Sequence, residues 1–306
     1  MRFLRTTASG WVVVSWATCL LCGAQLRAEP SMEQVNAMIK SGNPQVIPTL
    51  RRWLGDASER AKIATGDAKL FVAMNGVAAF RDEKCVRILQ LFYKHQTAER
   101  TVNHSAAEAL SVIGTRDTDL LLKILWDMQL PLKTRCQAAA TLVRLDFEVG
   151  RQFLLLHYDL YRWEHKTQSG WQMAPVREVL EQLDDAKIIA SLSDRLPKES
   201  DQRMRNNITT LSETMSLNGQ PIEALAKIAE NTSWKEGMYQ RYPAIRAIGR
   251  KGGTELIPLL ESLRPWATVD TGAIAGQQRY LKEFADAAVA AIKHRHWKES
   301  DLTPSN

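Results

Sequence analysis

Residues 156–174 hold the side chains whose types and spacing are best suited to binding chemistry. Aromatic rings stack on sugars, bases or apolar side chains, and a nearby positive charge can hold an anionic group. The candidate ligand-binding residues are Tyr158, Tyr161, Arg162, Trp163 and Trp171. The alternative is that these aromatic residues extend a helix and pack against its neighbour. The sequence leaves both interpretations open.

Two carboxylates in the same stretch, Asp159 and Glu164, are of the type that cleaves glycosidic bonds. That reaction needs an acid and a base held at a defined separation, and closeness in sequence alone does not supply it. The chain has no Gly-x-Ser-x-Gly motif and no paired Cys/His signature. We therefore predict no catalytic residues and expect that the protein is not an enzyme.

Histidines are the remaining candidates for chemistry, as metal ligands. His294 and His296 are two residues apart and point in different directions on a helix, whereas His157 and His165 lie two turns apart. A dedicated zinc site has more closely spaced ligands. The glycine-rich stretch 272–276 lacks the Lys-Ser/Thr ending of a phosphate-binding loop. We predict no metal site and no cofactor.

The elements that must position these residues are helices that repeat along the chain. Ala106, Ala109, Leu110 and Ile113 fall at positions i, i+3, i+4 and i+7 and so share one helical face. Further copies of this quartet begin at Ala73, Ala138, Val176, Asn207, Arg241 and Ala285. Successive copies start 31 to 44 residues apart, which is the spacing of helical-repeat proteins.

A second apolar face lies between the copies, for example at Leu121, Ile124, Leu125 and Met128. Each repeat is therefore predicted to be two antiparallel helices joined by a short turn. One helical pair cannot bury its apolar faces alone, so the pairs stack. The predicted fold is all-α, an α-solenoid of about seven helical pairs over residues 29–306.

Two segments carry a resemblance to a known family. The first is Ala106–Gly114 followed by Leu121 and Leu125, and the second is Ala244–Gly249 followed by Leu256 and Leu259. Both resemble the HEAT repeat, in particular the short form found in bilin-lyase-type arrays. This resemblance implies a helical scaffold with an extended binding surface, and it carries no catalytic residues with it.

The first 28 residues are typical of a secretory signal peptide. Arg2 and Arg5 precede an uncharged apolar stretch that ends near Ala24. The stretch is shorter than the roughly 20 apolar residues of a membrane span, so we expect cleavage and no membrane span afterwards. The alternative is that the leader is kept as an anchor. The domains predicted are therefore a signal peptide at 1–28 and the solenoid at 29–306, in a periplasmic or secreted protein.

Charge and cysteine content restrict the partners. Without the leader the chain has 37 basic and 34 acidic residues, too even a balance to predict nucleic-acid binding. Two basic groups, one that includes Arg51 and Arg52 and one that includes Arg246 and Arg250, are expected to lie on solvated helix faces or in the C-terminal turns of helices. Cys85 and Cys136 are expected to be buried thiols. The favoured function is an exported scaffold that binds another protein, and the alternative is an envelope enzyme or glycan-binding accessory protein that uses residues 156–174.

Overall fold

The structure is a computed structural model. It describes residues 29–302 with the exception of residues 59–66, 95–99, 161–165, 168–169, 172–174, 232–237 and 264–272. The predicted signal peptide, residues 1–28, lies outside the described residues and stays a prediction.

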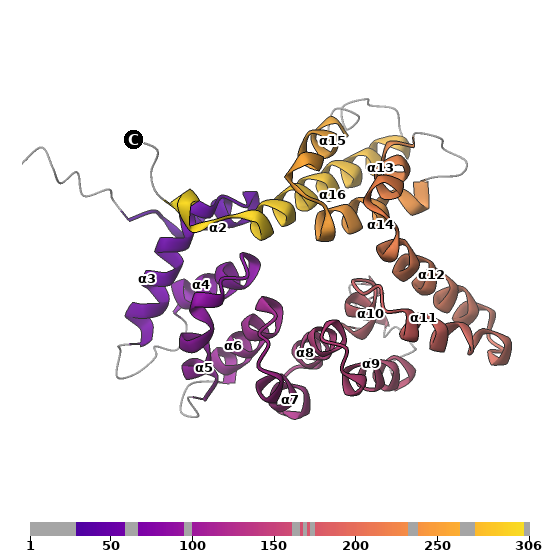
Figure 1. Ribbon diagram of the computed structural model, residues 1–306, viewed down its shortest axis with the longest axis horizontal. Helices are drawn as coiled ribbons and strands as arrows, with labels where there is room; N and C mark the ends of the chain where they lie inside the picture. Colours follow the sequence, from indigo (N-terminus) through magenta and orange to yellow (C-terminus); the bar gives the residue numbers. More distant parts are fainter. Residues whose placement is uncertain are drawn as a thin grey trace, which may run out of the picture.

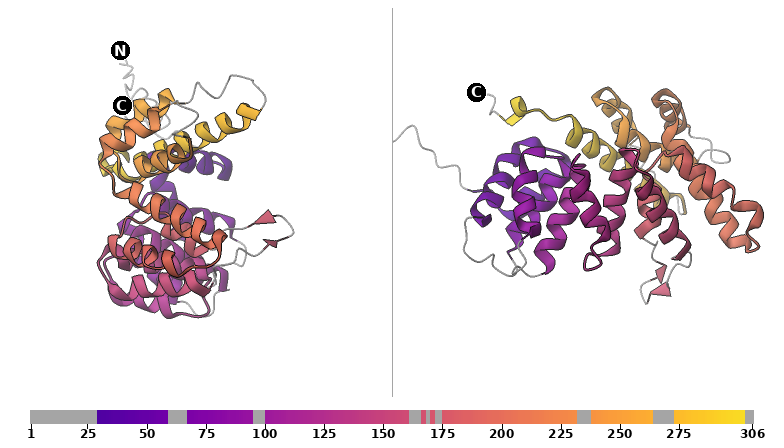
Figure 2. Two further views of the ribbon diagram at one scale, coloured as in Figure 1. Left: turned by 90° about the vertical axis from the view of Figure 1, so that its right-hand side faces the viewer. Right: turned by 60° about the horizontal axis from the view of Figure 1, so that its bottom comes forward.

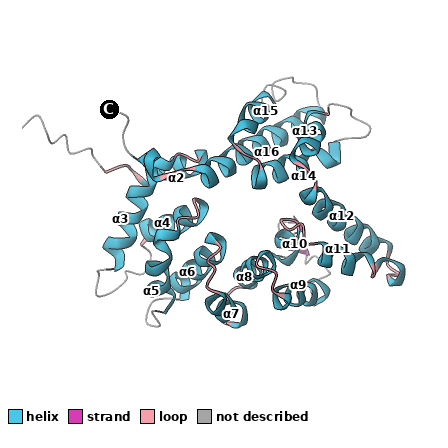
Figure 3. Ribbon diagram, viewed as in Figure 1, coloured by secondary structure: helices cyan, strands magenta, loops and turns pink. Residues whose placement is uncertain are grey.

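The described chain is built from α-helices, which confirms the predicted all-α class (Figure 3). The α-helices are α2 (Met32–Ser41), α3 (Ile47–Ser58), α4 (Ala68–Ala79), α5 (Val86–Lys94), α6 (Arg100–Ile113), α7 (Thr118–Trp126), α8 (Leu132–Arg144), α9 (Glu148–Leu160), α10 (Pro175–Leu180), α11 (Ala186–Ser193), α12 (Gln202–Gly219), α13 (Ile222–Glu230), α14 (Met238–Lys251), α15 (Ile257–Ser262) and α16 (Ala273–His296). Short 3₁₀ helices are η1 (Pro44–Val46), η2 (Glu83–Cys85), η3 (Leu196–Lys198), η4 (Thr254–Leu256) and η6 (Glu299–Leu302). Strands β1 (Lys166–Thr167) and β2 (Gly170–Trp171) form an antiparallel hairpin between α9 and α10.

Local sequence fixes where several helices begin and end. Aspartate side chains accept backbone N–H bonds at the start of α4, α7, α11 and α12, which satisfies donors that have no partner within the helix. Four helices, α2, α4, α6 and α8, are followed by a residue with positive φ: Gly42, Arg81, Gly114 and Asp146. Glycine is the usual residue in this conformation, so Arg81 and Asp146 adopt it at some cost in backbone strain.

The even-numbered helices form a layer of their own. They contact one another in the order α2, α4, α6, α8, α10, α12, α14 and α16, and α16 also contacts α2. We call these eight helices the inner layer. Odd-numbered helices pack outside it: α4, α6 and α8 lie inside α5, α7 and α9 (Figure 1). The chain therefore closes into a ring of helices, and its C-terminal helix returns to its N-terminal helices.

The predicted apolar quartets lie on the buried faces of the inner layer in most copies. All four residues of the copies beginning at Ala73, Ala106, Val176 and Ala285 are buried. The copy on α12 was predicted in the wrong register, because Thr210 is exposed and the buried face is instead Met204, Ile208, Leu211, Met215 and Asn218. The threonines at the predicted positions do not specify which face of α12 is buried. Ile208 and Met215 each follow a predicted position by one residue, and their larger apolar side chains bury more area.

The two ends of the helical array meet through α16 and η6. The ring of His294 lies 4.6 Å from that of Phe80, and its Nε2 is 2.8 Å from the Ile39 carbonyl oxygen. Trp297 donates from Nε1 to the carbonyl oxygen of Phe80 at 2.8 Å. Gly42 has φ +69°, and a Cβ there would lie 2.7 Å from Cβ of Lys293. This contact between helix ends leaves no room for a side chain at Gly42.

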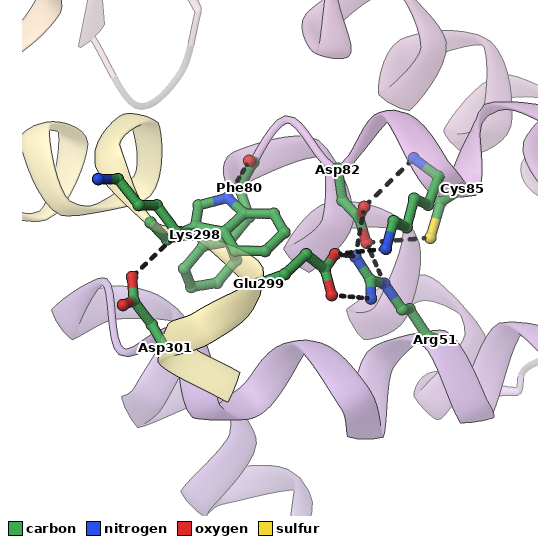
Figure 4. Close-up of polar contacts among 9 residues, drawn as sticks. Arg51, Phe80, Asp82, Cys85, Lys298, Glu299 and Asp301 are labelled. Atoms are coloured by element: carbon green, nitrogen blue, oxygen red, sulfur yellow. Dashed lines mark hydrogen bonds and ion pairs between the residues drawn. The ribbon is translucent and has the colours of Figure 1, made fainter. Parts of the chain in front are cut away.

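Arg51 on α3 links three parts of this junction (Figure 4). It donates to the buried carboxylate of Asp82 at 2.7 and 2.9 Å and to Glu299 on η6 at 2.7 Å. Its guanidinium also lies 5.8 Å from the ring centre of Trp297. The prediction of a solvated face is therefore wrong for Arg51, because tertiary contact brings two carboxylates to it. A similar link recurs at α9, where Arg151 donates to Asp185 at 2.9 Å.

Replacement of Arg51 should destabilise the protein. Arg51→Ala leaves the buried carboxylate of Asp82 without its charged partner, and loss of one member of such a pair costs about 3 kcal/mol. Arg52→Ala is the matched control, because Arg52 forms only an exposed ion pair with Glu29 and should cost less than about 1 kcal/mol. Chemical denaturation of both variants measures the difference. Equal stabilities for the two variants would contradict the structural role of Arg51.

The junction should also weaken in acid. Arg51 and Lys84 hold the pKa of Glu299 at about 2, below its usual value of 4.5. A lowered folded-state pKa contributes stability above the unfolded pKa, and this contribution is lost as pH falls from about 4.5 towards 2. The melting temperature of Glu299→Gln should therefore lie below that of the wild type above pH 5 and converge with it near pH 2. A difference that stays constant over this range would contradict the assignment.

Candidate binding surfaces

The predicted aromatic site lies only partly among the described residues. Tyr158 is on α9 and is buried, with 5% of its surface exposed. Tyr161, Arg162 and Trp163 lie outside the described residues, and Trp171 belongs to strand β2. The hairpin projects from the body of the protein beyond α9 (Figure 2). The burial of Tyr158 agrees with the packing alternative, and a binding role for the five residues stays a prediction.

Exposed apolar side chains form a different candidate surface on three consecutive outer helices. Leu91 is on α5, Trp126 ends α7, Met128 follows it, and Leu156 and Leu160 lie one turn apart on α9. Each of the five is more than half exposed. We call these five residues the apolar edge. Monomeric proteins seldom expose large apolar groups together unless they bind something there.

Two contacts connect these three helices at the C-terminal end of α7. Tyr93 at the end of α5 donates from its hydroxyl to Asp127 at the end of α7, at 3.3 Å. The ring of Trp126 meets that of Phe153 on α9 edge to face, at 5.9 Å. Each residue of the apolar edge lies in the C-terminal half of its helix or just beyond it.

Sequence reasoning missed this surface. Met128 was assigned to the buried face of its helix with Leu121, Ile124 and Leu125. Those three residues are buried, but Met128 lies beyond the end of α7 and is 72% exposed. The prediction for Met128 is wrong because α7 ends at Trp126, where Asp127 takes an extended conformation. Helical periodicity does not reveal where the helix stops.

A polar pocket of about 560 Å³ lies between α10, α12 and α14. Glu178 and Glu181 line one wall and Arg246 and Arg250 the opposite wall, with threonines of α12 between them. Arg246 approaches Glu181 at 3.8 Å. The opposed charges of the two walls partly neutralise one another, so the pocket by itself does not favour a ligand of one charge.

Metal ligands and thiols are two kinds of reactive group to consider among the described residues. Within them no three His, Cys, Asp or Glu side chains gather as metal ligands do. Cys85 and Cys136 are buried, as predicted. Burial raises the pKa of each thiol to about 12, which removes the thiolate needed for nucleophilic attack. None of the helices in the described part of the chain is long and apolar enough to cross a membrane.

Comparison with known proteins yields weak structural likeness and no match in sequence. No family model matches the sequence, and no curated protein matches it. Among solved structures the chain is similar to human deoxyhypusine hydroxylase in complex with glycerol, with 14% sequence identity and a TM-score of 0.27. The match covers 86% of this chain and 97% of that one. A likeness at this level assigns neither a family nor a reaction.

The same comparison corrects one prediction. The sequence led us to expect that the protein is not an enzyme, and the matched solved structure is that of an enzyme. The exclusion is therefore wrong, because it treated the lack of a local catalytic motif as evidence against catalysis. Helical repeats position side chains from many helices, and chemistry built from such side chains leaves no local motif in the sequence.

The burial of Tyr158 should be measurable as stability. Tyr158→Ala removes a buried aromatic ring and should lower the free energy of unfolding by about 3 kcal/mol. Leu156→Ala, on the same helix but exposed, should cost less than about 0.5 kcal/mol. Chemical denaturation distinguishes the two variants. If Tyr158→Ala unfolded like the wild type, packing would no longer account for this residue.

Proposed function

We propose that the protein is an exported helical-repeat scaffold that binds another protein through the apolar edge. One observation carries the proposal: Leu91, Trp126, Met128, Leu156 and Leu160 are each more than half exposed on consecutive helices. A few residues supply most of the binding energy of a protein interface, and tryptophan is among the most frequent of them. A partner that covers this edge would remove them from water.

The arrangement of the helices supports a scaffold role. The ordered contacts of the inner layer and its repeated helix ends agree with a HEAT-like solenoid, which is the architecture we propose. Such arrays present neighbouring repeats as one continuous surface. In this architecture, the three outer helices α5, α7 and α9 offer the partner a set of parallel ridges.

The compartment is proposed from the sequence. The positive residues and apolar stretch of residues 1–28 favour export, which places the scaffold in the periplasm or outside the cell. Its partner would then be a protein of the cell envelope or of the exterior. The near balance of charge without the leader gives no reason to propose a nucleic-acid partner.

Affinity capture with variants at the apolar edge tests the proposal. The wild-type protein is used as bait on cell-envelope extracts, alongside the double variant Trp126→Gln/Leu160→Gln. Both substitutions are at exposed positions, so the variant should fold normally, with a change in stability within about 1 kcal/mol. We expect the wild type to recover a specific protein, and the double variant to recover at least tenfold less of it. Apolar side chains buried at an interface contribute about 1–2 kcal/mol each to the binding free energy.

Phe147→Gln is the matched control. Phe147 is also an exposed apolar residue, but it lies before α9, at the opposite end of that helix from Leu160. It should leave recovery unchanged. If all three baits recovered the same proteins, or none, the apolar edge would not be the binding surface. Recovery of glycans in place of a protein would favour the alternative function that uses residues 156–174.

A further inference from the structure

The C-terminal ends of the inner-layer helices lie along one rim of the helical ring. At one part of this rim, α4 meets α16: the rings of Phe80 and His294 are in contact, and Trp297 donates to the Phe80 carbonyl. Arg81 follows Phe80 and Arg295 follows His294. Two arginines from helices more than 200 residues apart in sequence are therefore neighbours.

The rim continues from α16 through α14 to α12. Arg295 donates to the carbonyl oxygens of Gly249 and Gly252, the latter at 2.6 Å, on both sides of Arg250. Arg250 in turn donates to the side-chain oxygen of Asn218 at the end of α12. A third arginine thus joins the first two.

From α12 the rim passes to α10 and α8. The amide of Asn218 donates to the carbonyl oxygens of Glu181 and Leu183 at 2.9 and 2.8 Å. Asp184 follows these residues, and its charge acts on both Arg144, the last residue of α8, and Arg250. We call Arg81, Arg144, Arg250 and Arg295 the arginine rim.

Neighbouring members of the arginine rim repel one another: Arg81 acts on Arg144 and Arg295, and Arg144 acts on Arg250. Burial first, and then the charge of Arg81, lowers the pKa of Arg144 and of Arg295, the latter to about 10. Burial also lowers the pKa of Arg250 to about 10, with Arg246 and Arg144 as the next causes. Arg144, the last residue of α8, keeps part of its surface exposed to solvent. An anion could reach such a group.

Helix dipoles explain only part of this arrangement. Arginines at helix C-termini complement the partial negative charge of the last carbonyls, and the bonds of Arg295 serve that purpose. Within the described part of the chain, however, the side chains of Arg81 and Arg144 have no hydrogen bond or ion pair. Arg81 also occupies a positive-φ position, φ 50°, where glycine would fit without strain. Hydrogen bonds and ion pairs within the fold therefore do not account for these two side chains.

We propose that the arginine rim is a binding site for a multivalent oxyanion, held by the guanidinium groups of Arg81, Arg144 and Arg250. Guanidinium groups donate paired hydrogen bonds to carboxylate and phosphate oxygens. The ligand carries several negative charges, because a single charge would leave part of the repulsion in place. This site is separate from the apolar edge and holds whether or not that edge binds a protein.

Titration calorimetry at low ionic strength, in a buffer without phosphate, tests the site. The probes are inorganic pyrophosphate and citrate, which distinguish a phosphate ligand from a carboxylate ligand. We expect the wild type to bind at least one probe at a single site. The double variant Arg81→Gln/Arg144→Gln should bind it at least tenfold more weakly, since it loses two charged hydrogen-bond donors.

Arg87→Gln provides the matched control, because Arg87 is an exposed arginine on the outer helix α5 and should leave affinity within about twofold of the wild type. Absence of binding by the wild type at about 1 mM probe, or equal losses in the control and the double variant, would overturn the proposal. The melting temperature gives a second readout. Without anion, Arg144→Gln should melt no lower than the wild type because it removes repulsion, and a drop of more than about 5 °C would show that Arg144 serves the fold instead.

Discussion

The two ends of the helical array meet where α16 contacts α2, and most other features of the molecule depend on this contact. Stacked helical pairs leave an uncovered face at each end of an array. Here α16 lies against α2, and Trp297 and Leu302 pack on the core formed by the N-terminal helices. Arg51 joins the same contact to Asp82 and Glu299. The buried core falls into two clusters, one up to Met215 and one from Leu225 onwards, and the C-terminal residues link them.

Closure of the inner layer gives its two sides different chemistry. The C-terminal helix ends of the layer converge at one rim, and polar groups from α10, α12, α14 and α16 bond to one another there. The arginines that cap these ends are thereby drawn together. The outer helices α5, α7 and α9 have no such closing layer over them, and their C-terminal halves expose leucine, methionine and tryptophan. A charged rim and an apolar edge therefore arise from the same alternation of inner and outer helices.

The candidate surfaces show how far local patterns reach. The density of aromatic residues in the insertion predicts a ligand-binding site, yet Tyr158 is buried in the core. Met128 fitted a helical period but lies beyond the helix end. The weak likeness to a hydroxylase structure corrects the expectation that the lack of a local motif implies the absence of catalysis. It leaves the proposed binding functions to be judged on their own residues.

The sequence by itself determined the helical class of the fold and the spacing of its repeated helices. Apolar residues at i, i+3, i+4 and i+7 specify which side of each helix is buried, because that spacing is a local property of the chain. It determined the burial of Cys85 and Cys136, and it failed at α12 where threonines weakened the pattern. Only the tertiary structure decided that α16 returns to α2, that Arg51 is paired, and that Arg81, Arg144, Arg250 and Arg295 are neighbours. Some of these contacts join residues more than 200 positions apart in the sequence. Their formation depends on the rotation from each helical pair to the next, added up over the whole array, which no local pattern encodes.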